Sequence, residues 1–175
     1  MKILFRATFD FMRRVRADLS RPHPFADERV GFIAVRATAG AGHLVLLAEN
    51  YYPIADHEYI RDPSVGALIG QEALRKALET ALLQPVGMFH VHQHLFPGSL
   101  WFSHTDLREQ QRFVPDFFKV RDAMPHGALV LSHTAAAGRV WLSPTDIHVI
   151  NEFDTIGATM EIQPTVSDGS VDFYA

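Results

Sequence analysis

The chain contains no cysteine among its 175 residues. This absence excludes a disulfide framework, a zinc site built from thiolates and a thiol nucleophile. Long apolar runs are missing too, because no stretch approaches the roughly 20 residues that cross a bilayer. The first residues, MKILFRATFDF, also lack the apolar segment and cleavage site of a secretory signal. We therefore expect a cytoplasmic protein with no membrane partner.

Positive charge is also in short supply. Lys and Arg number 16 against 20 Asp and Glu, which gives a formal net charge of −4. Nucleic-acid binding needs a clustered basic face, and the one basic group has helical spacing: Arg13, Arg14, Arg16 and Arg21. We interpret this group as a solvated helix face or a partner contact, and we expect no nucleic-acid partner.

Hydrophobic residues make up 47% of the sequence, enough for the core of one domain. Their periodicity predicts helices over 9–19, 71–83 and 105–118. Strands are expected over 2–7, 28–37, 43–49, 86–92, 128–132, 139–142, 147–153 and 159–162. Residues 51–59 contain Pro53 and are expected to form an edge or irregular segment. The pattern indicates a single α/β (α+β) domain over residues 1–164 and a polar tail over 165–175.

Two of the predicted helices carry further local signals. Thr8 is a candidate N-cap for the first helix. The second helix has an apolar face made of Leu74, Ala77, Leu78, Ala81 and Leu82.

The densest chemical signal is the segment 86–106, VGMFHVHQHLFPGSLWFSHTD. His90, His92 and His94 occupy every second position at the end of an apolar run, and residues two apart on a strand point to the same side. Ser103 and Asp106 follow one loop later. Two imidazoles and one carboxylate are three metal ligands, which leaves a fourth position for water as in catalytic zinc sites. The Ser-x-x-Asp pair is also an ordinary helix N-cap box, and both readings can hold.

Hydrolysis at such a site needs a general base as well as a metal. Glu28 opens the apolar run DERVGFIAV and is our candidate for this role. Glu49 is a rival, because it also ends an apolar strand. The position of Glu28 relative to Gly31 favours Glu28 over Glu49.

The order Glu28, His90, His92, Ser103 and Asp106 resembles the JAMM motif of the JAB/MPN metalloprotease domain. The surroundings agree, because Gly31 follows the glutamate, Gly87 precedes the His-x-His pair, and a predicted helix precedes that strand. The resemblance covers roughly residues 5 to 150. It implies an MPN/JAB-like fold, a curved mixed β-sheet flanked by helices, and the short chain resembles the stand-alone prokaryotic branch of the family.

Two departures from the family pattern leave the ligand pair open. Gln93 stands where the family often has proline after the second histidine, and the segment from His92 to Ser103 is longer than usual. His92 and His94 are therefore an alternative pair with a more usual spacing. We prefer His90 and His92, because they lie on the apolar run at a fixed offset from Gly87. His94 would then lie at the rim of the site or support a ligand, and a role as a third histidine ligand stays open.

The resemblance implies one zinc ion per chain, held by His90, His92 and Asp106, and the donor set suits zinc, although iron or manganese can occupy such sites. It also implies that Glu28 transfers protons and that the Ser103 hydroxyl stabilises the oxyanion. The implied activity is that of a zinc metalloprotease, a deubiquitinase-like isopeptidase. It would remove or mature a ubiquitin-like modifier and accompany modifier-activating and conjugating enzymes. A non-catalytic MPN-type scaffold and a small-substrate metallohydrolase are the alternatives.

The remaining chemistry-bearing residues receive structural interpretations. We expect His104 on a helix surface and His133 in a turn. The loop 93–102 carries Phe96, Leu100, Trp101 and Phe102. These aromatic and apolar side chains are either core residues or a docking surface beside the metal, and the sequence leaves both open.

Overall fold

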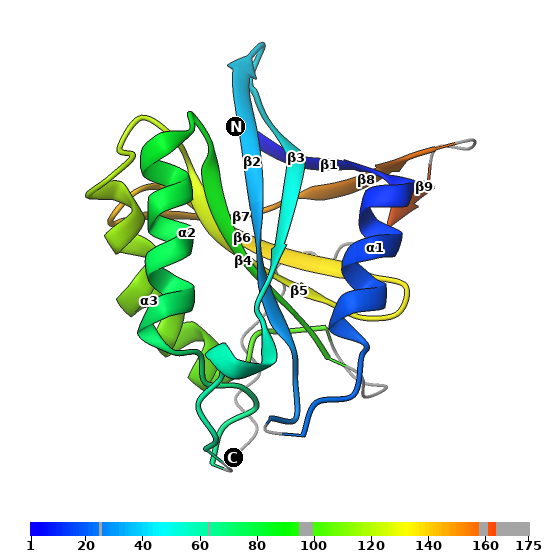
Figure 1. The fold of residues 1–175 in the computed structure, drawn as a ribbon. Coiled ribbons are helices and arrows are strands. Elements are labelled where there is room, and N and C mark those ends of the chain that lie inside the picture. The colour runs from blue at the N-terminus through cyan, green and yellow to red at the C-terminus, as the bar shows by residue number, and fades with distance from the viewer. Residues whose placement is uncertain (25, 63, 95–99, 158–160, 164–175) are drawn as a thin grey trace.

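One mixed sheet organises the fold of the computed structural model, which describes all residues except 25, 63, 95–99, 158–160 and 164–175 (Figure 1). The predicted tail therefore lies outside the described residues. The strands are β1 (Lys2–Thr8), β2 (Val30–Gly40), β3 (His43–Pro53), β4 (Gly87–Gln93), β5 (His126–Leu131), β6 (Ala136–Ser143), β7 (Asp146–Val149), β8 (Glu152–Ile156) and β9 (Glu161–Gln163). The helices are α1 (Phe9–Leu19), α2 (Gln71–Leu83) and α3 (His104–Phe118), with a 3-10 turn at Asp56–Glu58.

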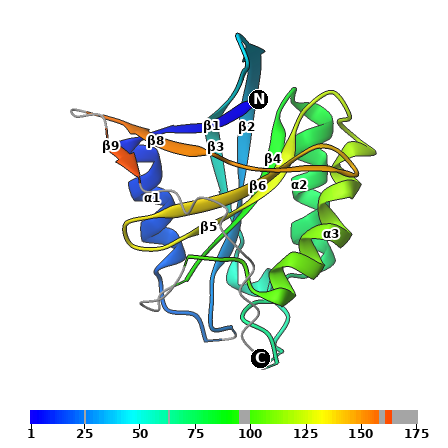
Figure 2. The same cartoon turned by 180° about the vertical axis from the view of Figure 1, so that it is seen from behind.

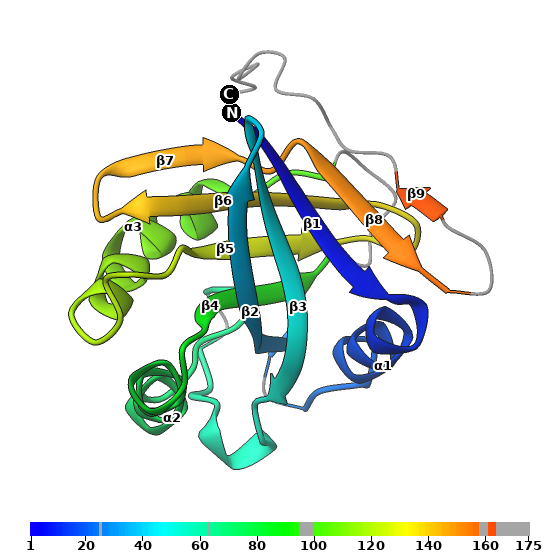
Figure 3. The same cartoon turned by 90° about the horizontal axis from the view of Figure 1, so that it is seen from above.

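The order of strands in the sheet is β7-β6-β5-β4-β2-β3-β1-β8-β9. β1 is parallel to both β3 and β8, β4 is parallel to β5, and the other neighbours are antiparallel. The sheet is strongly curled, with α1 on one side and α2 and α3 on the other (Figures 1 and 3). The predicted α/β class with a curved mixed sheet and three helices is confirmed at this level.

Successive side chains of the central strands point to opposite faces of the sheet, and this divides the hydrophobic core into two parts. Ile33 of β2 and Phe89 of β4 pack with the apolar face of α1. Phe32 and Met88, their neighbours in sequence, face the opposite way and pack with α2 and α3. The even-numbered side chains of β4 therefore point toward the side that α2 and α3 cover. α3 also lies beside β5 and β6 (Figure 2).

Local signals in the sequence located the helices well. Thr8 caps α1, where its hydroxyl accepts a hydrogen bond from the Phe11 amide at 3.2 Å. The predicted face of α2 is wrong at Leu82, which is 54% exposed. The buried stripe is Ala73, Ala77 and Ala81, and these small residues let the helix lie close to the sheet. None of the helices in the described ranges is long and apolar enough to cross a membrane.

Three strand predictions needed correction. β2 begins at Val30 rather than residue 28, and β3 continues to Pro53 through residues expected to be irregular, with a register shift in β2. The single strand predicted over 147–153 is two strands, β7 and β8. Between β7 and β8 the chain passes from β6 to β1, where Asn151 forms two hydrogen bonds with Ile3. The Ile3 amide donates to the Asn151 side-chain oxygen at 2.7 Å, and the Asn151 amide donates to the Ile3 carbonyl at 2.9 Å.

His126 is fully buried at the start of β5. Its Nδ1 accepts a hydrogen bond from the Met88 amide at 3.0 Å, and its Nε2 lies 2.8 Å from the Arg121 carbonyl. The ring stacks on Phe117 and meets Phe118 edge-on. This set of partners requires a neutral imidazole with the proton on Nε2. Burial lowers the pKa of His126 to about 4.

The protein is expected to lose stability in acid because of His126. Its folded pKa lies below the unfolded value of about 6.5, so the unfolded chain binds more protons between these values. The stability that the neutral His126 contributes is fully present above pH about 6.5. It falls toward pH 4 by up to about 1.4 kcal/mol per pH unit. Urea unfolding at a series of pH values should show a flatter profile for His126→Gln than for the exposed-site control His43→Gln. Parallel profiles for the two variants would contradict this assignment.

Candidate metal centre

The pairing of β2 with β4 sets the position of the candidate site. Val30 pairs with His92 in this antiparallel register, so residue 28 comes to lie opposite residue 94. His94 directly follows β4, and its amide donates to the Leu131 carbonyl at 2.9 Å. His90, His92 and His94 thus all lie on the α2 and α3 side of the sheet, and Glu28 is brought beside the last of them.

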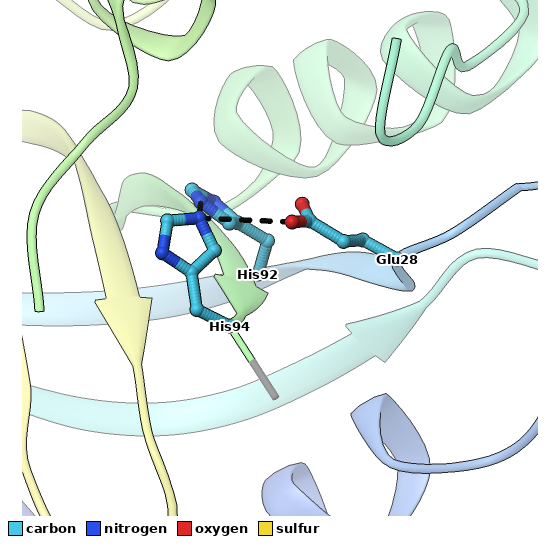
Figure 4. Close-up of side chains that lie close together, drawn as sticks. All are labelled: Glu28, His92 and His94. Atoms are coloured by element: carbon cyan, nitrogen blue, oxygen red, sulfur yellow. Dashed lines mark hydrogen bonds and ion pairs between the residues drawn. The ribbon is translucent and has the colours of Figure 1, made fainter. Parts of the chain in front are cut away.

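Four side chains meet at this end of β4, three of which are drawn in Figure 4. The Nε2 atoms of His92 and His94 are 3.2 Å apart. Glu28 Oε1 lies 3.7 Å from His94 Nε2. Asp106 Oδ2 lies 3.6 Å from His92 Nε2 and 3.9 Å from His94 Nε2. Ring nitrogens and carboxylate oxygens therefore converge on one small volume.

Asp106 is held in place by the start of α3. Its Oδ2 accepts hydrogen bonds from both the amide and the hydroxyl of Ser103, each at 2.7 Å, and its own amide donates to Ser103 Oγ at 3.1 Å. Burial alone would raise the pKa of Asp106, but His92 and the Ser103 donors outweigh burial and lower it. The carboxylate is therefore ionised and oriented, as a metal ligand requires.

Glu28 is anchored through the segment 64–70. The amides of Asp27 and Glu28 both donate to the Gly66 carbonyl, at 2.9 and 3.0 Å. A Cβ atom at Gly66 would lie 3.1 Å from the Glu28 carboxyl group, which is a tight contact. Glycine at this position therefore avoids crowding the carboxyl group. Burial raises the pKa of Glu28, although His92 opposes the shift. A carboxylate with a raised pKa suits a general base that must later release its proton.

His90 has different surroundings. Its ring meets Phe32 and Phe113 edge-on, with centroids 5.6 and 5.3 Å away. Burial lowers its pKa to about 3, and its Nδ1 has no hydrogen-bond partner among the described residues. Glu28, His92 and His94, by contrast, place one ligand atom each within 4.8 Å of one another. The structure gives the position beside Glu28 to His94 and not to His90, which favours the alternative ligand pair.

The four converging residues fit a divalent first-row metal ion. Two imidazole nitrogens bound tetrahedrally at 2.0–2.1 Å lie about 3.3–3.4 Å apart, and the Nε2 atoms of His92 and His94 are 3.2 Å apart. One proton must lie between these two nitrogens when they bond to each other, and a metal ion would take its place. Two imidazoles with the Asp106 carboxylate are donors that zinc accepts.

Other residues singled out in the sequence lie elsewhere. Glu49 forms an ion pair with Arg36 at 2.9 Å and does not line the cavity described below. His104 is exposed at the start of α3, as expected, and His133 is exposed in the bend between β5 and β6, where a turn was expected. Gln93, which stands where the family often has proline, points to the other side of the sheet and donates to Ser20 Oγ at 3.2 Å. It therefore links the end of β4 to the end of α1.

A cavity of about 500 Å³ opens from the histidine cluster. Its walls come from the segment 64–71, from α2 and from α3, and Glu28, His92, His94, Ser103 and Asp106 line one part of it. In the loop 93–102, Leu100 is buried against Val130, while Trp101 is 37% exposed. Leu100 is thus a core residue and Trp101 is available for contacts. Phe96 lies outside the described residues.

Comparisons with known proteins add little to this geometry. No protein-family model matches the chain, and no curated protein matches it. Among solved structures, the chain is similar to the STIL N-terminal domain of Trichoplax adhaerens, with a TM-score of 0.41 and 10% identity. That match covers 78% of this chain and 41% of the other, so it spans less than half of that protein. A likeness this weak carries no functional argument.

Proposed function

We propose that this protein is a zinc-dependent metalloprotease of the JAMM type. The observation that carries the proposal is the convergence of His92, His94 and Asp106 beside Glu28, at one end of a cavity. Two imidazoles, an ionised carboxylate and a separate, half-buried carboxylate are the parts that amide hydrolysis by a metal site needs. His92, His94 and Asp106 are the proposed ligands, and the pair of His90 and His92 is replaced accordingly.

Glu28 does the proton transfer in this proposal. A zinc ion held by the three ligands would lower the pKa of water and polarise the amide carbonyl. Glu28 accepts a proton from the attacking water as the new C–O bond forms. It then delivers that proton to the leaving nitrogen as the C–N bond breaks, so that a free amine departs. The Gly66 carbonyl holds the Glu28 backbone still during both transfers.

Ser103 has two proposed tasks. Its hydroxyl donates to Asp106, so its first task is to orient that ligand. The oxyanion role that the family resemblance implies would need the hydroxyl to turn toward the substrate carbonyl. The amide of Ser103 keeps its own bond to Asp106 at 2.7 Å, which would hold the carboxylate when the hydroxyl turns.

The proposed substrate is the tail of a ubiquitin-like modifier, cleaved from a conjugate or matured at its end. The second candidate is a small-substrate metallohydrolase, and the observation that favours it is the cavity, whose volume of about 500 Å³ is typical of small-molecule sites. A non-catalytic scaffold has no need of ionisable groups gathered in this way.

The test combines metal analysis with cleavage. The purified protein is expected to hold one zinc per chain and to cleave a modifier fusion, with loss of activity on chelation and recovery on adding zinc. The same assay on N-acyl amino acids separates the two hydrolase candidates. Zinc-loaded protein that cleaves neither substrate would refute both of them and leave the scaffold.

A further inference from the structure

A buried glutamine in the cavity wall has no use in the proposed chemistry. Gln110 of α3 is 1% exposed and lines the same cavity as the histidine cluster. Neither its Oε1 nor its Nε2 has a hydrogen-bond partner among the described residues. Buried amides normally bond both atoms, and leaving them unpaired costs stability. A ligand in the cavity would give Gln110 the partners that the protein does not supply.

His90 is a second residue of the cavity lining that has a buried polar atom without a partner in the described part of the chain. That atom is its Nδ1. Phe113 packs against the His90 ring and lies one helical turn beyond Gln110, and it lines the cavity as well. The ring is thus held fixed between aromatic side chains. Polar atoms on an immobile apolar wall are typical of a recognition pocket.

The charges of the cavity restrict what the ligand can be. Glu28, Asp106 and Glu109 line it, and its described lining residues include no Lys or Arg. Even with a divalent ion balancing two of these carboxylates, the cavity has no net positive charge. An anionic ligand is therefore disfavoured. The amide of Gln110 has both donor and acceptor atoms, so the best match is a neutral group that also has both.

We propose that Gln110, with His90, recognises a carboxamide side chain of the substrate, an asparagine or glutamine next to the cleaved bond. Gln110 Nε2 donates to the ligand carbonyl, and the ligand NH₂ donates to Gln110 Oε1. His90 Nδ1 takes part in whichever role its tautomer allows. The methylene groups of the ligand pack against Leu74 and Phe113, which line the apolar part of the wall. The position next to the cleaved bond rests on the proposed function.

The first test measures binding without metal or cleavage. Protein labelled with ¹⁵N is titrated with N-acetylglutamine amide and with N-acetylnorleucine amide, which differ only in the side-chain head group. The Gln110 side-chain resonance should shift with the first probe, whose affinity should be at least about tenfold higher. The preference should vanish in Gln110→Met and survive in Gln111→Met, an exposed glutamine on the same helix. Equal binding of both probes by the wild-type protein would overturn the proposal.

The second test uses stability and cleavage. The Tm of Gln110→Met should be higher than that of the wild-type protein, because the substitution removes a buried amide that has no partner. The Tm of Gln111→Met should not rise. Gln110→Met should also lose at least about tenfold in kcat/KM on fusions with glutamine before the bond, but not on fusions with norleucine. A fall in Tm would show that the protein itself pairs Gln110 and would overturn the idea. If the protein distinguishes the two probes but cleaves no fusion, only the proposed hydrolase function is refuted. If it cleaves the fusions but binds both probes equally, only the recognition by Gln110 is refuted.

Discussion

Replacing Glu28 with glutamine is expected to leave zinc bound and to lower kcat by about 10²–10⁴-fold. Glutamine has nearly the same shape, and the backbone bond from residue 28 to the Gly66 carbonyl is unchanged. The variant loses only the ability to accept and release a proton. Turnover of a cleavable substrate and zinc content by mass spectrometry, measured on the same sample, check both halves of the expectation.

Glu49→Gln is the matched control, because Glu49 was the rival base and is paired with Arg36 on the sheet surface. It should retain full turnover. The assignment of the base is refuted by native activity in Glu28→Gln, and a loss confined to Glu49→Gln would transfer the role to Glu49.

The ligand pair can be decided by two histidine variants. His94→Gln should weaken zinc binding by more than about 100-fold, since even residues that only support a ligand are worth 10–100-fold. His90→Gln should keep its zinc, because the His90 ring is fixed by Phe32 and Phe113 outside the close group. Competition with a coloured chelator measures both affinities, and thermal unfolding confirms that each variant is folded.

The opposite result has an equally clear meaning. Zinc retained by His94→Gln and lost by His90→Gln would restore the pair of His90 and His92. Loss in both variants would indicate that all three imidazoles contribute, with His90 reaching the ion after a movement of its ring. Only loss of zinc in His94→Gln with retention in His90→Gln agrees with the separations of 3.2 Å between the Nε2 atoms of His92 and His94 and of 3.6 and 3.9 Å from Asp106 Oδ2 to these two atoms.

Features set by neighbouring residues could be predicted from the sequence. Thr8 and Ser103 cap their helices because a hydroxyl next to free amides acts within one turn. The order of Glu28, His90, His92, Ser103 and Asp106 in the sequence predicts one site, and all five residues line one cavity. His90 lies in that lining but outside the group of ligand atoms that Glu28, His92 and His94 place close together. The zinc ion and the substrate remain predictions.

Features set by distant pairing could not be predicted in the same way. A period of two places His90, His92 and His94 on one face but says nothing about which of them meets Glu28. That choice follows from the pairing of Val30 with His92, which joins segments far apart in the sequence. Gln110 is a similar case, because the sequence Gln110-Gln111 gives no sign of which glutamine is buried.

The place of β1 in the sheet has a consequence for how the chain folds. β1 lies between β3 and β8, and the bonds between Ile3 and Asn151 join residues 148 positions apart. Contacts of such long range form slowly, because a large loop must close before any bond compensates for the lost chain entropy. Until β8 arrives, β1 leaves a row of amides and carbonyls open to strands of other molecules. The part of the sheet that contains β1 and β8 is therefore the part most exposed to aggregation while the chain folds. The candidate site depends instead on the pairing of β2 with β4, which joins residues that are closer in the sequence.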